Sequence, residues 1–149
     1  MNYILWAVII FFTIIIQGSV SLFDVTPNFT AVLAYYLGVK RGKINGMFFG
    51  SFIGIVEDSL SYTFLGPNLL SKGMIGYLSS LISSKLFIWT PVLGIISISI
   101  LTITDSFIVF VSRSVFDIMP VSIGVAVFII LIQSLLNAPL GIFIKPDEK

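Results

Sequence analysis

Six long apolar runs follow one another along the chain, and short polar segments separate them. A helix needs about 20 residues to cross the hydrocarbon core of a membrane, because each residue adds only about 1.5 Å to its length. The runs predict helices over residues 3–20, 28–39, 44–60, 69–84, 87–112 and 120–136, and residues 137–149 are predicted to form a cytoplasmic tail. The expected fold is therefore an all-α integral membrane protein, with residues 1–149 as a single transmembrane domain of six transmembrane helices.

Residues 96–104 nearly alternate between apolar and hydroxyl side chains, a pattern that in a soluble protein indicates a half-buried strand. An isolated strand cannot cross lipid, because its backbone N–H and C=O groups would lack hydrogen-bond partners. This segment is therefore still predicted to be helical. Its hydroxyl groups are expected to bond back to backbone carbonyls or to face neighbouring helices.

The composition of the chain excludes several classes of function. Hydrophobic residues make up 57% of the chain and charged residues 10%, against about 25% charged residues in a typical soluble domain. Neither His nor Cys occurs, which excludes thiol chemistry, disulfides and the usual zinc ligands. The net charge of +1 gives no basic field for nucleic acid. We expect no nucleic-acid partner, no cofactor and no metal.

The basic residues predict the orientation in the membrane. Lys40, Arg41 and Lys43 form a cluster between the second and third runs, and basic loops of this kind stay in the cytoplasm. Alternation of six helices then places both termini in the cytoplasm. On this topology, Lys85, Lys145 and Lys149 are also cytoplasmic, whereas Asp24, Arg113 and Asp117 lie in outer loops.

Glycine recurs at every fourth position from Gly38 to Gly54, and Asp58 occupies the next step. Positions four apart drift by only about 40° around a helix, so these residues form a narrow groove along the predicted helix 44–60. A groove of small residues lets a second helix approach closely. Two interpretations are open: packing against another helix of this chain, or a groove for the helix of a partner protein. The groove residues are Gly42, Gly46, Gly50 and Gly54.

Four charged residues fall inside or near the outer half of the predicted hydrocarbon region, namely Glu57, Asp58, Lys72 and Asp105. A charge there is costly unless it is paired or hydrated. We therefore expect a buried polar cluster in which Lys72 pairs with at least one carboxylate. Asn68, Thr102 and Thr104 are candidates to complete its hydrogen bonds.

This cluster has three open interpretations: a structural clasp between helices, a polar cavity for a ligand, and a path for ions or protons. Transport usually needs titratable groups along the whole path, and the inner half of the predicted bundle has none, which disfavours the third. Glu57 and Asp58 are adjacent and point about 100° apart on a helix, so they do not form an opposed acid and base pair. We expect a protein that is not an enzyme.

Several short motifs follow one another between residues 27 and 84. They are Pro27-Asn28-Phe29, Lys40-Arg41-Gly42, the ladder Gly46, Gly50, Gly54 and Asp58, then Gly66-x-Asn68 and Gly73-x-x-Gly76-Tyr77. Their order and spacing resemble the rod-shape-determining membrane protein family MreD, and Asn137-Ala138-Pro139 extends the likeness to the last helix. The resemblance implies structural or partner-contacting roles, and no catalytic role, for Asn28, Asp58, Asn68 and Lys72.

The resemblance also implies a function. MreD proteins are non-enzymatic multi-pass scaffolds in the bacterial cytoplasmic (inner) membrane, surrounded by membrane lipid, and they belong to the cell-elongation complex. The implied partner is MreC, whose single membrane helix and periplasmic domain regulate peptidoglycan synthesis by RodA and a class B penicillin-binding protein, above MreB filaments.

The family is also similar in fold to the S components of energy-coupling-factor vitamin transporters. The alternative function is therefore a membrane subunit that binds a small vitamin-like ligand for an energy-coupled transporter. Such subunits often present small residues on the first helix to the coupling protein. The first run here is bulky and has no ladder of small residues, which disfavours the alternative.

Overall fold

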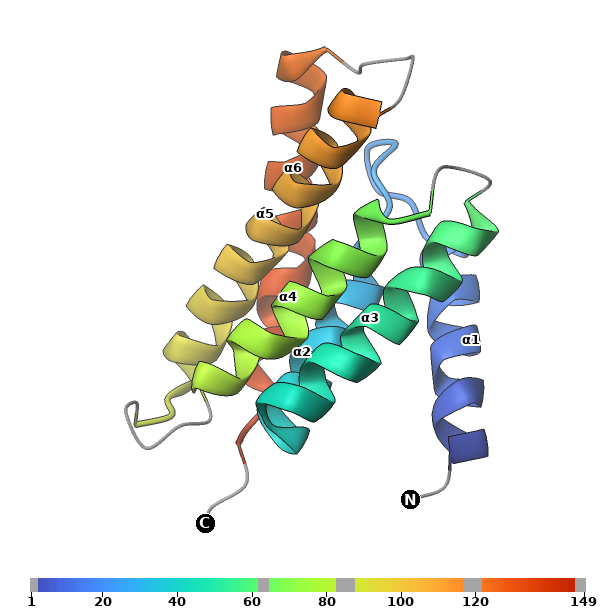
Figure 1. The fold of residues 1–149 in the computed structure, drawn as a ribbon. Helices are drawn as coiled ribbons and strands as arrows, with labels where there is room; N and C mark the ends of the chain where they lie inside the picture. Colours follow the sequence, from blue (N-terminus) through green and yellow to red (C-terminus); the bar gives the residue numbers. More distant parts are fainter. Residues whose placement is uncertain (1–2, 62–64, 83–87, 117–121, 147–149) are drawn as a thin grey trace.

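The computed structural model describes residues 3–61, 65–82, 88–116 and 122–146 (Figure 1). In these residues the chain is helical, and a single bridge between Leu22 and Val25 is the only β-type pairing. The prediction of an all-helical fold is confirmed. The elements are α1 (Tyr3–Ser19), α2 (Phe29–Arg41), α3 (Lys43–Leu60), α4 (Pro67–Ile82), α5 (Pro91–Phe116), α6 (Ile123–Asn137) and the 3₁₀ helix η1 (Ala138–Ile142).

Consecutive helices run in opposite directions, so their ends gather at two opposite ends of the bundle (Figure 1). The upper end in Figure 1 holds the last turns of α1, α3 and α5 and the first turns of α2, α4 and α6. The start of α1 and the helix η1 lie at the lower end. The helices α2, α3 and α4 form a closely packed centre, α5 joins α6 to α4, and α1 packs mainly along α2.

The helix α5 begins and ends later than the predicted range 87–112. It begins at Pro91, which suits the first turn of a helix because a backbone N–H at that position would have no partner inside the helix. Arg113 was assigned to an outer loop by the sequence, but it lies in the last turn of α5. That assignment is wrong because no helix breaker occurs between Arg113 and Phe116, so the helix continues. The alternating residues 96–104 are helical, as predicted.

Two other helices begin at residues that differ from the predicted ones. The helix α4 begins at Pro67 instead of residue 69, and α6 begins at Ile123 instead of residue 120. Residues 83–84 at the predicted end of the fourth helix lie outside the described residues, as do Lys85, Asp117 and Lys149.

The glycine ladder holds α3 against α4 of the same chain. A Cβ atom added to Gly46 would overlap the carbonyl oxygen of Gly76, and a Cβ on Gly50 would overlap that of Lys72. A Cβ on Gly54 would overlap the carbonyl oxygen of Asn68. The two backbones are therefore in direct contact along the ladder, which only residues without a side chain allow.

The interpretation of Gly46, Gly50 and Gly54 as a groove for a partner's helix is therefore wrong, because α4 already fills it. Gly42 does not belong to the groove at all. It is the single residue between α2 and α3, with φ of 82°, a conformation that glycine adopts without strain, and no atom lies close to its missing Cβ. Its role is to reverse the chain direction between two helices.

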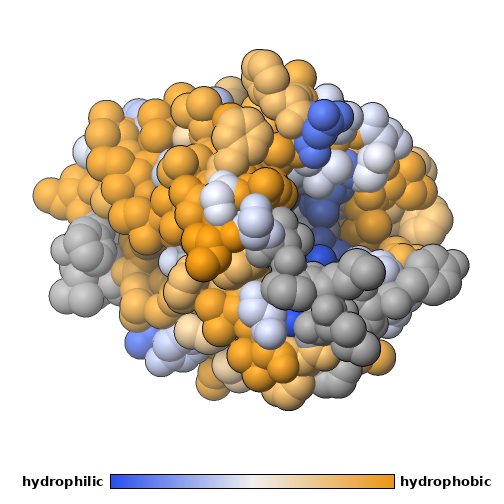
Figure 2. All heavy atoms as spheres, turned by 90° about the horizontal axis from the view of Figure 1, so that it is seen from above, coloured by the Kyte–Doolittle hydropathy of each residue, from blue (hydrophilic) through white to orange (hydrophobic). Residues whose placement is uncertain are grey.

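The outside of the bundle is mostly apolar, as Figure 2 shows for the upper end. Large hydrophobic side chains are exposed along α1, α5 and α6, whereas polar side chains are about as numerous as apolar ones among the buried residues. Two helical segments, Pro91–Phe116 and Ile123–Ile142, are long and apolar enough to span a membrane. So many exposed apolar side chains, around an interior this rich in polar ones, are unusual for a soluble protein.

Replacing Gly50 with Ala tests the backbone contact between α3 and α4. The added methyl group has no room, so the purified protein in detergent should lose about 1 to 3 kcal/mol of stability, the usual cost of overpacking. Gly18→Ala in α1 is the matched control, because nothing lies near its missing Cβ and the substitution should raise stability by a fraction of about 1 kcal/mol through helix propensity. Thermal unfolding of both variants provides the comparison. Equal melting temperatures would contradict the close contact.

Candidate functional site

Polar side chains from several helices meet at the upper end of the bundle. The last turns of α3 carry Glu57 and Asp58, and the first turns of α4 carry Asn68 and Lys72. Because the glycine ladder brings these two helices into backbone contact, the four side chains lie close together. Asp105 reaches the same place from α5. The structure therefore brings together all five residues of the predicted polar cluster.

Asp58 is fully buried and binds the start of α4. Its carboxylate accepts hydrogen bonds from the backbone N–H groups of Gly66, Asn68 and Leu69, at 2.9, 3.2 and 3.2 Å, and from the side-chain amide of Asn68 at 2.8 Å. The first N–H groups of a helix have no acceptor within it, and they form the positive end of its dipole. Asp58 thus caps α4 from α3 and is not the partner of Lys72.

Lys72 is fully buried and lies between two carboxylates. Its Nζ is 2.8 Å from Oε2 of Glu57 and 3.4 Å from Oδ2 of Asp105. It also donates a hydrogen bond to Oδ1 of Asn68 at 2.9 Å. An ammonium group has three protons, and each of them has an acceptor here. The predicted pairing of Lys72 with a carboxylate is confirmed.

Both carboxylates that face Lys72 also accept hydrogen bonds from uncharged side chains. Glu57 accepts them from the amide of Gln17 in α1, at 3.1 Å, and from the hydroxyl of Thr30 in α2, at 2.8 Å. Asp105 accepts them from the side chains of Asn28 and Ser71. Five helices therefore contribute to one network, and each negative charge in it is surrounded by donors.

Asn28 connects three helices through both its side chain and its backbone. Its Oδ1 caps α2 by accepting from the N–H of Ala31 at 3.1 Å, and its Nδ2 donates to Asp105. Its carbonyl accepts from Nδ2 of Asn137, at the end of α6, at 3.0 Å. Asn137 also donates to the hydroxyl of Thr102 at 3.2 Å. The start of α2 is thus attached to α5 and α6.

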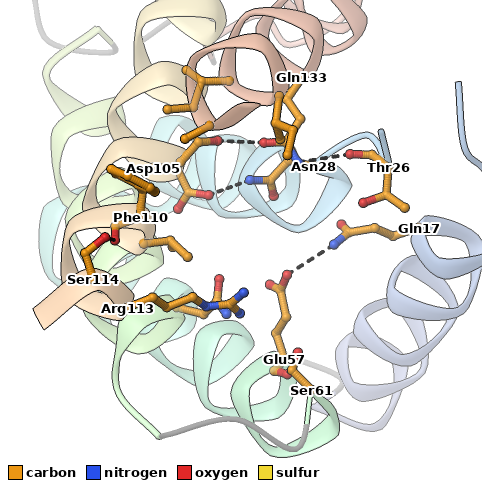
Figure 3. A pocket seen from close by; sticks show the side chains of 16 residues that line it. Gln17, Thr26, Asn28, Glu57, Ser61, Asp105, Phe110, Arg113, Ser114 and Gln133 are labelled. Carbon is orange, nitrogen blue, oxygen red and sulfur yellow. Dashed lines mark hydrogen bonds between the residues drawn. The ribbon is translucent and has the colours of Figure 1, made fainter. Parts of the chain in front are cut away.

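A cavity of about 420 Å³ opens beside this network. Figure 2 shows hydrophilic residues inside a hollow in the otherwise hydrophobic upper end, and Figure 3 shows Glu57 and Arg113 pointing into the cavity from two different helices. One wall is apolar and comes from α5 and α6. The polar lining includes Gln17, Glu57, Asp105, Arg113 and Gln133, and the apolar wall consists of Val109, Phe110, Ile129 and Ile130.

A second hollow, which we call the lateral groove, lies on the side of the bundle. It has a volume of about 390 Å³, its floor is α2, and its walls come from α1 and from the segment at η1. Its lining is almost entirely apolar. The residues are Thr13, Ile16, Phe29, Val32, Leu33, Tyr36, Leu140 and Ile144.

Sequence reasoning missed several members of the polar site, namely Gln17, Thr30, Ser71, Arg113, Gln133 and Asn137. Gln17 and Gln133 are isolated polar residues within apolar runs, and such residues in a membrane helix usually face the protein interior, so a signal for them existed. Of the candidates to complete the cluster, Asn68 does so, Thr102 bonds to Asn137 instead, and Thr104 bonds back to the carbonyl of Ile100.

Comparison of the chain with protein-family models, with curated proteins and with solved structures finds no match. The resemblance to the MreD family therefore stays a prediction from the sequence motifs. In the part of the chain that the structure describes, no group of three or more acidic side chains is placed to hold a metal ion. The site consists of ion pairs that join Lys72 of α4 to carboxylates of α3 and α5. Beside them lies a cavity that is large enough for a small molecule.

Replacing Lys72 with Met tests the charge network. The substitution leaves two carboxylates without their cation, so the protein should lose about 3 to 5 kcal/mol of stability, the usual cost of breaking a buried ion pair. Lys43→Met, at the exposed start of α3, is the control and should leave stability within about 0.5 kcal/mol. Melting temperatures in detergent measure both effects. Adding Glu57→Gln and Asp105→Asn to Lys72→Met should recover part of the loss, and a network without energetic coupling would show no recovery.

Proposed function

We propose that all six helices cross the bacterial cytoplasmic membrane, with both ends of the chain in the cytoplasm. The exposed apolar side chains of α1, α5 and α6 support this placement, because water would penalise so large an apolar surface. The cluster Lys40, Arg41 and Lys43 lies where α2 meets α3, at the same end as the start of α1 and as η1. An even number of antiparallel helices with basic residues at that end fits the positive-inside rule.

Within this membrane, the chain acts as a non-enzymatic scaffold of the cell-elongation complex, as the MreD proteins do. The observation that carries the proposal is that the motifs behind the resemblance form one interlocked unit. Gly46, Gly50 and Gly54 place α3 against α4, and Asp58 then caps α4 at Asn68. Motifs that are separate in sequence thus have one structural purpose, which supports treating them as a single family pattern.

MreC is the proposed partner, and through MreC the chain acts on RodA, a class B penicillin-binding protein and MreB. Because α4 fills the glycine groove, the membrane helix of MreC needs another surface, and the lateral groove provides one. The hydroxyl of Thr13 donates to the carbonyl of Ile9 at 2.8 Å, so it brings no unpaired donor to the groove. An apolar membrane helix can pack there without leaving a polar group unsatisfied.

Val32→Trp, which fills the lateral groove, tests this docking site. With tagged chain and MreC expressed together, the variant should reduce the recovery of MreC in detergent by at least about tenfold, equivalent to about 1.4 kcal/mol of binding energy. Leu131→Trp on the exposed face of α6 is the control and should leave recovery unchanged. Normal recovery with Val32→Trp and loss with Leu131→Trp would move the docking site to α6. Failure of the parent chain to retain MreC would refute the scaffold proposal.

The cavity at the upper end favours a second candidate function, a membrane subunit that binds a small vitamin-like ligand for an energy-coupled transporter. Its volume of about 420 Å³ lies within the range of about 300 to 1,000 Å³ that is usual for small-molecule sites. Against this candidate, the exposed face of α1 carries the bulky side chains of Phe11, Phe12, Ile15 and Ile16, and α1 presents no ladder of small residues to a coupling protein.

Native mass spectrometry of the purified chain distinguishes the two functions. The scaffold proposal predicts the mass of the chain alone, apart from detergent and lipid adducts that vary with the preparation. A vitamin-sized adduct at a constant one-to-one ratio, retained through several detergents, would support the transporter subunit and would count against the scaffold.

A further inference from the structure

Arg113 is the charged side chain of the cavity that the polar network does not use. In the residues that the structure describes, it makes no hydrogen bond or ion pair, and its Nε is buried without a partner. Figure 3 shows its guanidinium group pointing into the cavity from the last turn of α5. A buried N–H group without an acceptor is costly. A ligand that brings acceptor atoms would remove that cost.

Glu57 also lines the cavity, but its carboxylate is already engaged. Its carboxylate accepts from Lys72, Thr30 and Gln17. The ammonium of Lys72 faces two carboxylates, and a third carboxylate, Asp58, is bound by the N–H groups at the start of α4. Arg113 supplies the second positive charge near the cavity. A ligand at Arg113 therefore does not have to displace an existing ion pair.

Three of the hydroxyl groups of the lining are also engaged as donors. Each donates to an acceptor of the protein, so a ligand finds few free O–H groups in the cavity. They belong to Ser61, Ser106 and Ser114. The guanidinium of Arg113 is thus the cationic donor that the cavity leaves unused, and a fitting ligand brings acceptors to it.

We propose that this cavity binds the phosphate group of an anionic amphiphile, with Arg113 as the partner of the phosphate. A planar guanidinium group donates two parallel hydrogen bonds to a phosphate, which an ammonium group cannot do. Beside it, the apolar wall that contains Phe110 and Ile130 suits an acyl chain better than a free ion. The inference rests on the membrane placement proposed above, which puts Arg113 at the outer surface, but it does not depend on MreC.

Isothermal titration of the purified full chain in a nonionic detergent tests the site. Short-chain phosphatidic acid is the main probe and inorganic phosphate is the second. Arg113→Gln should weaken binding of phosphatidic acid at least about tenfold, whereas Arg41→Gln, an exposed arginine at the lower end, should leave it unchanged. Arg113→Lys keeps the charge and loses the paired donors, so it should bind with intermediate affinity. It also serves if Arg113→Gln fails to fold.

Phe110→Ala separates the two sources of phosphate. It should weaken binding of phosphatidic acid and leave inorganic phosphate unaffected, because only the lipid contacts the apolar wall. Inorganic phosphate binding as tightly as the lipid, with no effect of Phe110→Ala, would overturn the assignment to an amphiphile. Equal affinities in the parent and in both Arg113 variants, or no binding by the parent, would overturn the site itself. A failure of the membrane placement shows separately, as chain recovered without detergent from the soluble fraction of cells.

Discussion

Contact between the backbones of α3 and α4 determines where the charged groups at the upper end lie. Three glycines of α3 remove the side chains that would hold the helices apart, and the start of α4 then falls next to the end of α3. Asp58 can therefore cap α4, and Lys72 lies within 2.8 Å of Glu57. A larger residue at any of these glycines would move an entire helix and, with it, the partners of each charge. The packing of α3 against α4 therefore determines which charged groups can pair.

The burial of charge in turn explains why the polar network extends over so many helices. A buried carboxylate or ammonium group is tolerated only when its remaining hydrogen-bonding positions are filled. One neighbour is not enough for this, so α1 contributes Gln17, α2 contributes Asn28 and Thr30, and α5 contributes Asp105. The interior of the bundle consequently holds about as many polar as apolar side chains, whereas the large side chains on its surface include many that are apolar.

The sequence predicts the helices and the members of the charge cluster well, because long apolar runs and rare charges are strong signals. Pairing within the cluster was not predictable. Glu57 and Asp58 are neighbours in sequence, yet one pairs with Lys72 and the other caps α4, and only the rotation of α3 against α4 decides between them. The role of the glycine ladder stayed undecided for the same reason: a groove on one helix does not reveal which helix fills it. Arg113 was misplaced because nothing in an apolar run marks the last helical turn.

The hydrogen bond between Asn137 and the carbonyl of Asn28 joins residues 109 positions apart in the chain. During synthesis, α2 is complete long before α6 exists, so the start of α2 begins without this partner. Lys72 and Glu57, by contrast, belong to one pair of neighbouring helices, which can neutralise the lysine as soon as α4 has been made. Lys72 can therefore pair with Glu57 early in assembly, whereas the contacts of Asn137 with Asn28 and Thr102 form last. A ribosome that stalls before α6 would leave Lys72 paired with its carboxylates but the bundle not yet closed.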